Sequence, residues 1–132
     1  MKNSILKLSL FSIIGFGLLT SCSKNDDNKN VKDSRTVKYE ITGNAIGTYD
    51  AVYITGSATG ASAIPTSLPW AKEEVMKEGN NMLSITTSVD GATPGQKFTA
   101  KIFVGGIEKN SQTETVQANG MAVISSLSYT LK

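Results

Sequence analysis

The 132-residue chain contains no histidine, a single cysteine, a single tryptophan and only three prolines. Without histidine, neither a Ser-His-Asp nor a Cys-His nucleophile system can form. The commonest metal ligand is missing as well, which excludes zinc sites built from Cys and His. One cysteine cannot form an intramolecular disulfide. No nucleophile has a plausible activating base, so the sequence predicts neither an enzyme nor a cofactor.

The length corresponds to one domain at most, since domains typically have about 100–200 residues. Residues 1–21 have the pattern of an export signal, with Lys2 and Lys7 at the start and no acidic residue. Leu8 to Leu19 is an apolar run broken only by Ser and Gly. It is shorter than the about 20 residues that span a bilayer, and it fits the apolar region of a secretory signal. A short transmembrane anchor or a core helix is the alternative.

The apolar run ends in Leu19-Thr20-Ser21-Cys22. This sequence resembles the lipobox of bacterial lipoproteins. The resemblance implies cleavage between Ser21 and Cys22, a diacylglycerol on the Cys22 thiol, and acylation of the new amino group, for example with palmitate. Two or more acyl chains anchor a protein stably where one does not, so we expect a protein tethered to a membrane without spanning it. A buried structural cysteine is the alternative.

Removal of residues 1–21 changes the charge balance. The full chain has 13 basic and 11 acidic residues, and the signal takes Lys2 and Lys7 but no acid, which leaves 11 of each. A neutral mature chain gives no electrostatic reason to expect a nucleic-acid partner.

Residues 22–35 are expected to be the lipidated cysteine and a flexible polar tether. Ser23–Arg35 contains one aliphatic residue, Val31, and no aromatic, so it can bury little apolar surface. Fully extended, it would reach about 40–45 Å. Ser23–Asp27 resembles the export signal of surface lipoproteins in the Bacteroidota, although Asn25 separates the lysine from the acids. This resemblance implies an outer-membrane lipoprotein exposed at the cell surface; the periplasmic face of the membrane is the alternative.

Residues 36–132 are expected to form an all-β domain, because their dominant hydrophobic period is two. In Gln96–Val104, four apolar residues at even positions alternate with mostly polar ones. Gly105-Gly106 has the form of a two-residue hairpin loop. The strand spacing predicts an immunoglobulin-like antiparallel β-sandwich of about seven strands, with a small barrel as the alternative. The other strand-like segments are Thr36–Thr42, Tyr49–Thr55, Met82–Thr87 and Leu127–Leu131.

The segment 71–79 is ambiguous. Ala71–Glu78 has helix-favouring residues, and as a helix it would turn Val75 and Met76 inward, but packing overrides propensity at this length. We favour a strand at a sheet edge. Its glutamates are expected to be a solvated charged face rather than calcium ligands or an acid pair; they are Glu73, Glu74 and Glu78.

Several short motifs of the domain resemble one known family. They are Val37–Gly43, Tyr53–Thr55, Leu68–Lys72, Lys101–Gly106 and Tyr129–Leu131. Their succession is similar to that in the MmpS-type small mycobacterial membrane proteins, with V-x-Y-E-V-T-G, L-P-W-S-K and I-x-V-D-G. The resemblance implies a small β-sandwich and an accessory role in lipid- or siderophore-exporting transporters. The chain departs from the family in having a lipobox in place of a transmembrane helix and no cysteine pair in the domain.

Two aromatic residues are candidates for partner contact. Tryptophan is enriched at interaction hot spots, which makes Trp70 a candidate. Because Pro69 fixes the angle at which the chain enters, Trp70 is more simply explained as a plug of the core. Phe103 lies on the polar face of its predicted strand. No metal site is expected. The sequence therefore predicts a lipoprotein of the cell envelope that presents a non-catalytic binding or accessory module. Its expected partners are a membrane, bound through the lipid on Cys22, and an envelope protein or transporter.

Overall fold

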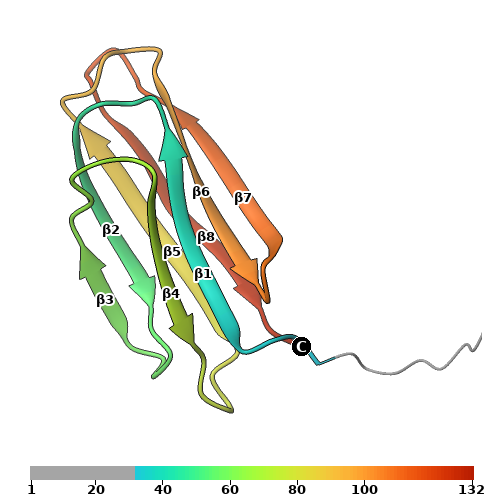
Figure 1. Ribbon diagram of the computed structural model, residues 1–132. Helices are drawn as coiled ribbons and strands as arrows, with labels where there is room; N and C mark the ends of the chain where they lie inside the picture. Colours follow the sequence, from blue (N-terminus) through green and yellow to red (C-terminus); the bar gives the residue numbers. More distant parts are fainter. Residues whose placement is uncertain (1–31) are drawn as a thin grey trace, which may run out of the picture.

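A computed structural model describes residues 32–132 of the chain. These residues form eight β-strands and no helix (Figure 1). Within this range, no helix is long and apolar enough to cross a membrane. The strands are β1 (Thr36–Gly43), β2 (Thr48–Ile54), β3 (Gly60–Ala63), β4 (Trp70–Val75), β5 (Met82–Asp90), β6 (Lys97–Val104), β7 (Ile107–Thr115) and β8 (Ala122–Thr130).

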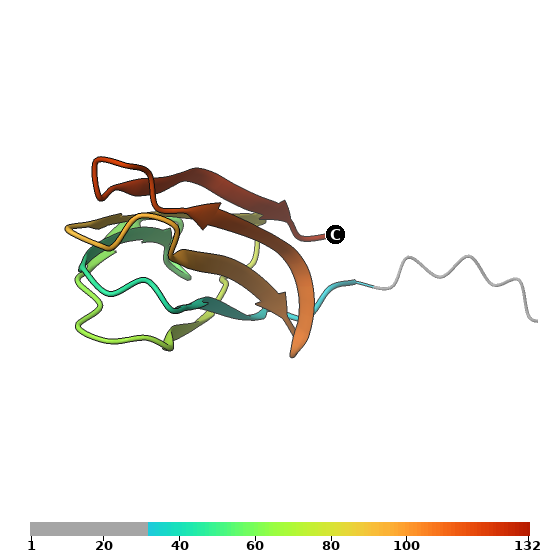
Figure 2. The ribbon, with the colours of Figure 1, turned by 90° about the horizontal axis from the view of Figure 1, so that it is seen from above.

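The strands form two four-stranded antiparallel sheets that pack face to face (Figure 2). One sheet has the order β4-β1-β6-β7 and the other the order β3-β2-β5-β8. The predicted antiparallel β-sandwich is therefore confirmed, with eight strands where about seven were expected. Over residues 32–132 the sheets share no backbone ladder, so the barrel alternative is wrong.

Alternating side chains of both sheets form the core. Every second residue of β1 and β6 is buried, as the period-two pattern predicts. Tyr39 is fully buried, and its hydroxyl donates to the Ile54 carbonyl at 2.8 Å. Burial raises the pKa of Tyr39 to about 12. The buried residues of these two strands are Val37, Tyr39, Ile41, Phe98, Ala100, Ile102 and Val104.

Strand direction divides the loops between two ends of the sandwich. Odd-numbered strands run away from the tether and even-numbered strands return (Figure 1). Residues 32–35 and the carboxyl terminus lie at one end, which we name the tether end. The opposite end, the distal end, carries four loops. They are the β1–β2, β3–β4, β5–β6 and β7–β8 loops, residues 44–47, 64–69, 91–96 and 116–121.

Two strands lack the alternation that identified the others. β3 is the four-residue segment GASA, and β7 is almost wholly polar. Both are edge strands, which need fewer apolar residues to pack. The Gly105-Gly106 hairpin that joins β6 to β7 is confirmed, because Val104 pairs with Ile107 across it. Both glycines have positive φ, +58° and +81°, as a type I′ turn requires.

The first part of the ambiguous segment, residues 71–75, lies in an edge strand, as favoured from the sequence, and residues 76–79 follow that strand. β4 pairs along one side with β1. Val75 is 68% exposed whereas Met76 is buried, so these two residues do not face inward together. Successive side chains of an extended chain point to opposite sides, which explains the difference from the helical alternative.

The last residues of the expected tether lie against the domain instead of extending freely from it. The Arg35 guanidinium donates to the backbone carbonyls of Met76 and Asn80 at 3.1 and 2.6 Å, and also to that of Lys77. It also donates to the Asn81 side chain at 2.9 Å. Arg35 thereby holds the start of β1 against the β4–β5 turn.

Asp33 makes the second attachment, to the end of the chain. Its carboxylate accepts hydrogen bonds from the Lys132 backbone N–H and the Tyr129 hydroxyl, each at 3.0 Å. Lys109 lies 3.2 Å from the other carboxylate oxygen. We name Asp33 and Arg35 the tether clamp. They attach residues 33–35 to the β4–β5 turn and to the end of the chain.

Asp33→Asn should make the domain less sensitive to acid. The backbone hydrogen bond from Lys132, aided by Lys109 and Tyr129, holds the pKa of Asp33 below its ordinary value of 3.8. A carboxyl with a lowered folded-state pKa stabilises the fold above its unfolded pKa, and this stabilisation is lost as the pH falls through the folded value. Between about pH 4 and pH 2, the denaturation midpoint should therefore fall less in the variant than in the wild type.

The matched control is Glu78→Gln. Glu78 also has a lowered pKa, through its hydrogen bond with Lys32, but both side chains of this pair are mostly exposed, at 84% and 64%. Its removal should change the acid sensitivity less than removal of the Asp33 carboxylate. Equal acid sensitivity in Asp33→Asn and the wild type would contradict the stabilising role of the clamp.

Candidate binding site at the distal end

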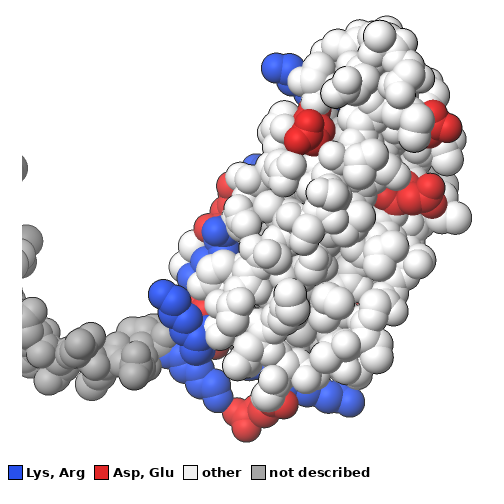
Figure 3. Space-filling model, turned by 180° about the vertical axis from the view of Figure 1, so that it is seen from behind, with Lys and Arg blue, Asp and Glu red and all other residues white. Residues whose placement is uncertain are grey.

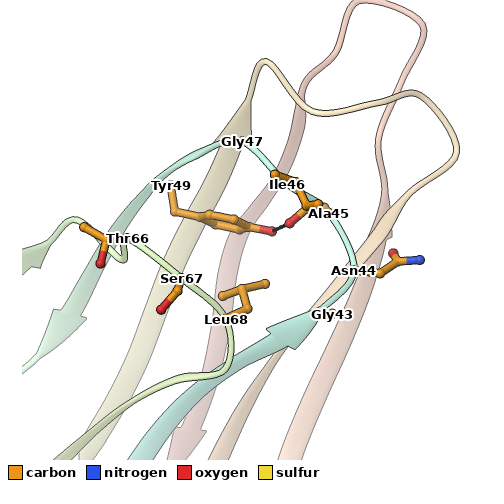
Figure 4. A pocket seen from close by; sticks show the side chains of 9 residues that line it. All are labelled: Gly43, Asn44, Ala45, Ile46, Gly47, Tyr49, Thr66, Ser67 and Leu68. Atoms are coloured by element: carbon orange, nitrogen blue, oxygen red, sulfur yellow. Dashed lines mark hydrogen bonds between the residues drawn. The ribbon is translucent and has the colours of Figure 1, made fainter.

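A cavity of about 450 Å³ opens at the distal end of the sandwich. Its two walls are the end of β1 with the β1–β2 loop, residues 43–47, and part of the β3–β4 loop, residues 66–68. The Tyr49 ring lies between them, and Leu68 points toward it (Figure 4). Both loops cross from one sheet to the other, so the cavity lies where the sandwich opens between its layers.

The first wall is held in place by hydrogen bonds to the start of β6. The backbone N–H groups of Asn44 and Ala45 donate to the Lys97 carbonyl at 3.0 and 3.2 Å. In return, the Lys97 N–H donates to the Asn44 side chain at 2.8 Å. The Ile46 N–H donates to the Gln96 side chain at 3.1 Å. These bonds leave the Ile46 side chain free in solvent, 79% exposed.

Tyr49 forms the floor of the cavity. Its side chain is buried, and its hydroxyl donates to the Ala45 carbonyl at 2.9 Å. The ring meets the Phe98 ring edge to face, with centroids 5.8 Å apart and an interplanar angle of 82°. Burial raises the pKa of Tyr49. The phenol therefore stays neutral and already has its hydrogen-bond partner, so it presents its apolar ring face.

The second wall is bounded by proline on both sides. Pro65 and Pro69 flank Thr66–Leu68, and proline restricts the backbone of the unfolded and folded chain alike. Leu68 packs against the core. Thr66 and Ser67 are exposed at the rim, where their hydroxyls are available to a bound molecule. The cavity thus has two ordered walls before any ligand enters.

The two aromatic candidates from the sequence lie elsewhere. Trp70 is half-buried on β4, with its ring centroid 6.0 Å from that of Tyr53. This place between the layers agrees with a plug of the core. Phe103 is on the outer face of the β4-β1-β6-β7 sheet, where the Lys38 ammonium lies 4.1 Å from its ring centroid. Neither residue lines the distal cavity.

The lipidation site and its cleavage point, Ser21 and Cys22, lie outside the described residues. The three glutamates of the β4 region do not share a common contact. Glu74 accepts a hydrogen bond from the Gly56 N–H and Glu78 one from Lys32, while Glu73 is exposed. Over residues 32–132, no group of three or more His, Cys, Asp or Glu side chains could hold a metal ion.

Charge is distributed unequally between the two outer faces. The outer face of the β4-β1-β6-β7 sheet carries the Lys38–Glu40 and Lys101–Glu108 ion pairs, at 2.8 and 3.1 Å. The opposite face is largely uncharged across its middle, as Figure 3 shows, with most of the basic side chains near the tether. Its exposed residues along β5 and β8 are mainly Ser and Thr.

Sequence reasoning did not find the distal cavity. Of the lining residues, only Gly43 and Leu68 were singled out from the sequence as parts of motifs, Val37–Gly43 and Leu68–Lys72. One signal was present in the sequence, the absence of charged residues from the two loops that line the cavity. However, these loops can be assigned to the same end of the sandwich only when the number of strands is known. No protein-family model matches the chain, and no curated protein matches it either.

Proposed function

We propose that the chain is a lipoprotein of the bacterial cell envelope that presents the β-sandwich as a non-catalytic binding module. The observation that carries this proposal is the position of the cavity at the end opposite the tether. The eight residues of β1 separate the two ends, about 25 Å at the usual rise per strand residue. An anchor at Cys22 would therefore hold the tether end toward the membrane and leave the cavity facing away from it.

The tether clamp supports this arrangement. Because Asp33 and Arg35 attach the chain to the domain, the free tether would be only Ser23–Val31, nine residues that reach at most about 30 Å. A short tether attached at a fixed point limits how far the domain can move from the membrane. With the anchor in the outer leaflet of the outer membrane, the domain and its cavity would be exposed at the cell surface.

The lining of the cavity supports binding rather than catalysis. Tyr49 is its one titratable side chain, and its hydroxyl is hydrogen-bonded to Ala45. General acid–base and nucleophilic catalysis need a reactive group within reach of a bound substrate. The residues that line this cavity offer apolar surface and neutral hydroxyls instead.

Metabolic labelling with palmitate tests the anchor. The wild-type chain should incorporate the label, whereas Cys22→Ser should incorporate none, because its hydroxyl does not form the thioether. Phe103→Ser is a control that leaves the lipobox intact and should be labelled like the wild type. Equal labelling of Cys22→Ser and the wild type would overturn the anchor.

A second candidate is a periplasmic accessory subunit of a lipid- or siderophore-exporting transporter. The motifs that resemble the MmpS-type family lie together, which favours it. Val37–Gly43 is β1, Leu68–Lys72 leads into β4 and Lys101–Gly106 ends β6. β1 pairs with both β4 and β6, so the three motifs are neighbours in one sheet. Protease treatment of intact cells separates the two candidates, because digestion of the domain without lysis would exclude a periplasmic location.

A further inference from the structure

The distal end is free of charge in all its loops. None of the residues in 44–47, 64–69, 91–96 and 116–121 is Lys, Arg, Asp or Glu. All three prolines of the chain lie in these loops, at 65, 69 and 94. The tether end differs, since its β4–β5 turn carries Lys77 and Glu78 and its clamp carries both signs of charge. Along the chain, the charges closest to the distal loops lie in the strands, at Asp50, Lys72, Asp90, Lys97 and Glu114.

An ionic ligand would gain little from such a site. Moving an ion out of water costs free energy unless an opposite charge or several strong hydrogen bonds replace its hydration. The cavity lining supplies no opposite charge, because its residues are Gly, Ala, Ile, Leu, Tyr, Asn, Ser and Thr. A neutral ligand carries no comparable desolvation cost. The lining therefore selects against charge of either sign.

The walls indicate the shape of the ligand that fits. The Tyr49 ring and Leu68 give an apolar interior, and Ile46 extends this apolar surface to the rim. Thr66 and Ser67 place hydroxyls at the opposite rim. The volume of about 450 Å³ lies within the usual range for small-molecule sites. A compact hydrocarbon group would fill the interior while a neutral polar group stays at the mouth.

We propose that the distal cavity binds a neutral small organic molecule, with an aromatic or branched hydrocarbon group against Tyr49 and Leu68 and a hydroxyl or carbonyl near Thr66 and Ser67. This inference rests on the proposed function, since it names the ligand class of the binding module. It makes charge the property by which the cavity discriminates among ligands.

Three probes of one shape test the discrimination. Benzyl alcohol, benzoate and benzylammonium share a ring and differ in charge. In the full chain with labelled methyl groups, benzyl alcohol should shift the NMR signals of Ile46 and Leu68 saturably. Ile107, the first residue of β7 at the tether end, should not shift. Both ions should bind at least about tenfold more weakly, and added salt should leave the affinity for benzyl alcohol unchanged.

A pair of matched variants locates the site. Ile46→Asp and Ile107→Asp make the same change at exposed isoleucines, 79% and 64% exposed, at opposite ends of the domain. With the NMR signal of Leu68 as the reporter, Ile46→Asp should weaken the binding of benzyl alcohol about tenfold and shift the preference toward benzylammonium. Ile107→Asp should bind as the wild type does.

Three outcomes would overturn the inference. They are no saturable shift of Ile46 and Leu68 with benzyl alcohol, either ion binding as tightly as the alcohol, or equal losses in the two variants. Failure of the proposed function is distinguishable from these outcomes. A chain that takes up no palmitate but discriminates among the probes would refute the anchor and retain the ligand class, and the reverse result would refute the ligand class alone.

Discussion

Phe98→Ala should lower the free energy of unfolding by about 3–5 kcal/mol, the usual cost of removing a fully buried phenylalanine. Phe98 has no exposed surface and is among the largest fully buried side chains of the core. Its ring also supports Tyr49 from below through the edge-to-face contact, and such pairs contribute about 0.5–1.5 kcal/mol beyond area burial. Urea denaturation followed by tyrosine and tryptophan fluorescence measures the change.

The same truncation at Phe103 is the matched control. Phe103 lies on the same strand, five residues further along, and its main side-chain contact is with the Lys38 ammonium. Phe103→Ala should therefore cost less than about 1 kcal/mol, as solvent-facing changes usually do. Similar losses at the two positions would contradict the assignment of opposite faces to the two rings.

Phe98→Ala should also affect the distal cavity. Without the ring beneath it, Tyr49 can move into the vacated space, and its hydrogen bond to Ala45 would then be lost. The NMR signals of Ile46 should shift in Phe98→Ala and stay unchanged in Phe103→Ala. Tyr49 belongs to both the core and the cavity lining, so a change in the core can reach the binding surface through it.

Strands that contribute an alternating apolar face to the core could be predicted from the sequence. In β1 and β6 every second residue is buried, and this burial is what produces the period of two. β3 and β7 could not be found in this way, because an edge strand can be held by backbone hydrogen bonds to one neighbour with few apolar side chains. The hydrophobic pattern of a strand reflects the burial of its side chains, and these two strands bury few apolar side chains.

Missing a strand also conceals which loops lie together. In an antiparallel sandwich each strand reverses direction, so the end at which a loop lies depends on the number of strands before it. Without β3, the loop after it cannot be assigned to the end that holds Asn44–Gly47. The distal cavity combines these two loops, and its residues are too distant in sequence for a motif to connect them.

The tether clamp could not be predicted either, because its contacts also join residues that are distant in the sequence. Asp33 and Arg35 lie in a polar segment with the composition of a flexible linker. Their partners come from the β4–β5 turn and the last residues of the chain, and contacts at this sequence separation leave no local pattern. Composition predicted that the segment has no strand or helix, but it could not predict the attachment of its final residues.

Gly43→Ala should destabilise the domain by about 2–4 kcal/mol and distort the first wall of the cavity. Gly43 has a φ of +144°, which side-chain-bearing residues rarely adopt and which costs about 1–3 kcal/mol. An added methyl group would also collide with the Lys97 carbonyl and lie 2.6 Å from the Phe98 Cα atom. The β1–β2 loop would have to move away from β6, at the expense of the Asn44 and Ala45 hydrogen bonds to Lys97.

Gly79→Ala separates backbone strain from this collision. Gly79 has a φ of +87°, but a methyl group there would meet no atom within 4 Å, so strain alone should cost about 1–2 kcal/mol. Denaturation midpoints should therefore rank wild type above Gly79→Ala and Gly79→Ala above Gly43→Ala. Only Gly43→Ala should also weaken the binding of benzyl alcohol and shift the NMR signal of Ile46, because Gly43, unlike Gly79, lets the cavity wall approach β6. Equal loss of probe binding in both variants would mean that general destabilisation, rather than displacement of the wall, closes the cavity.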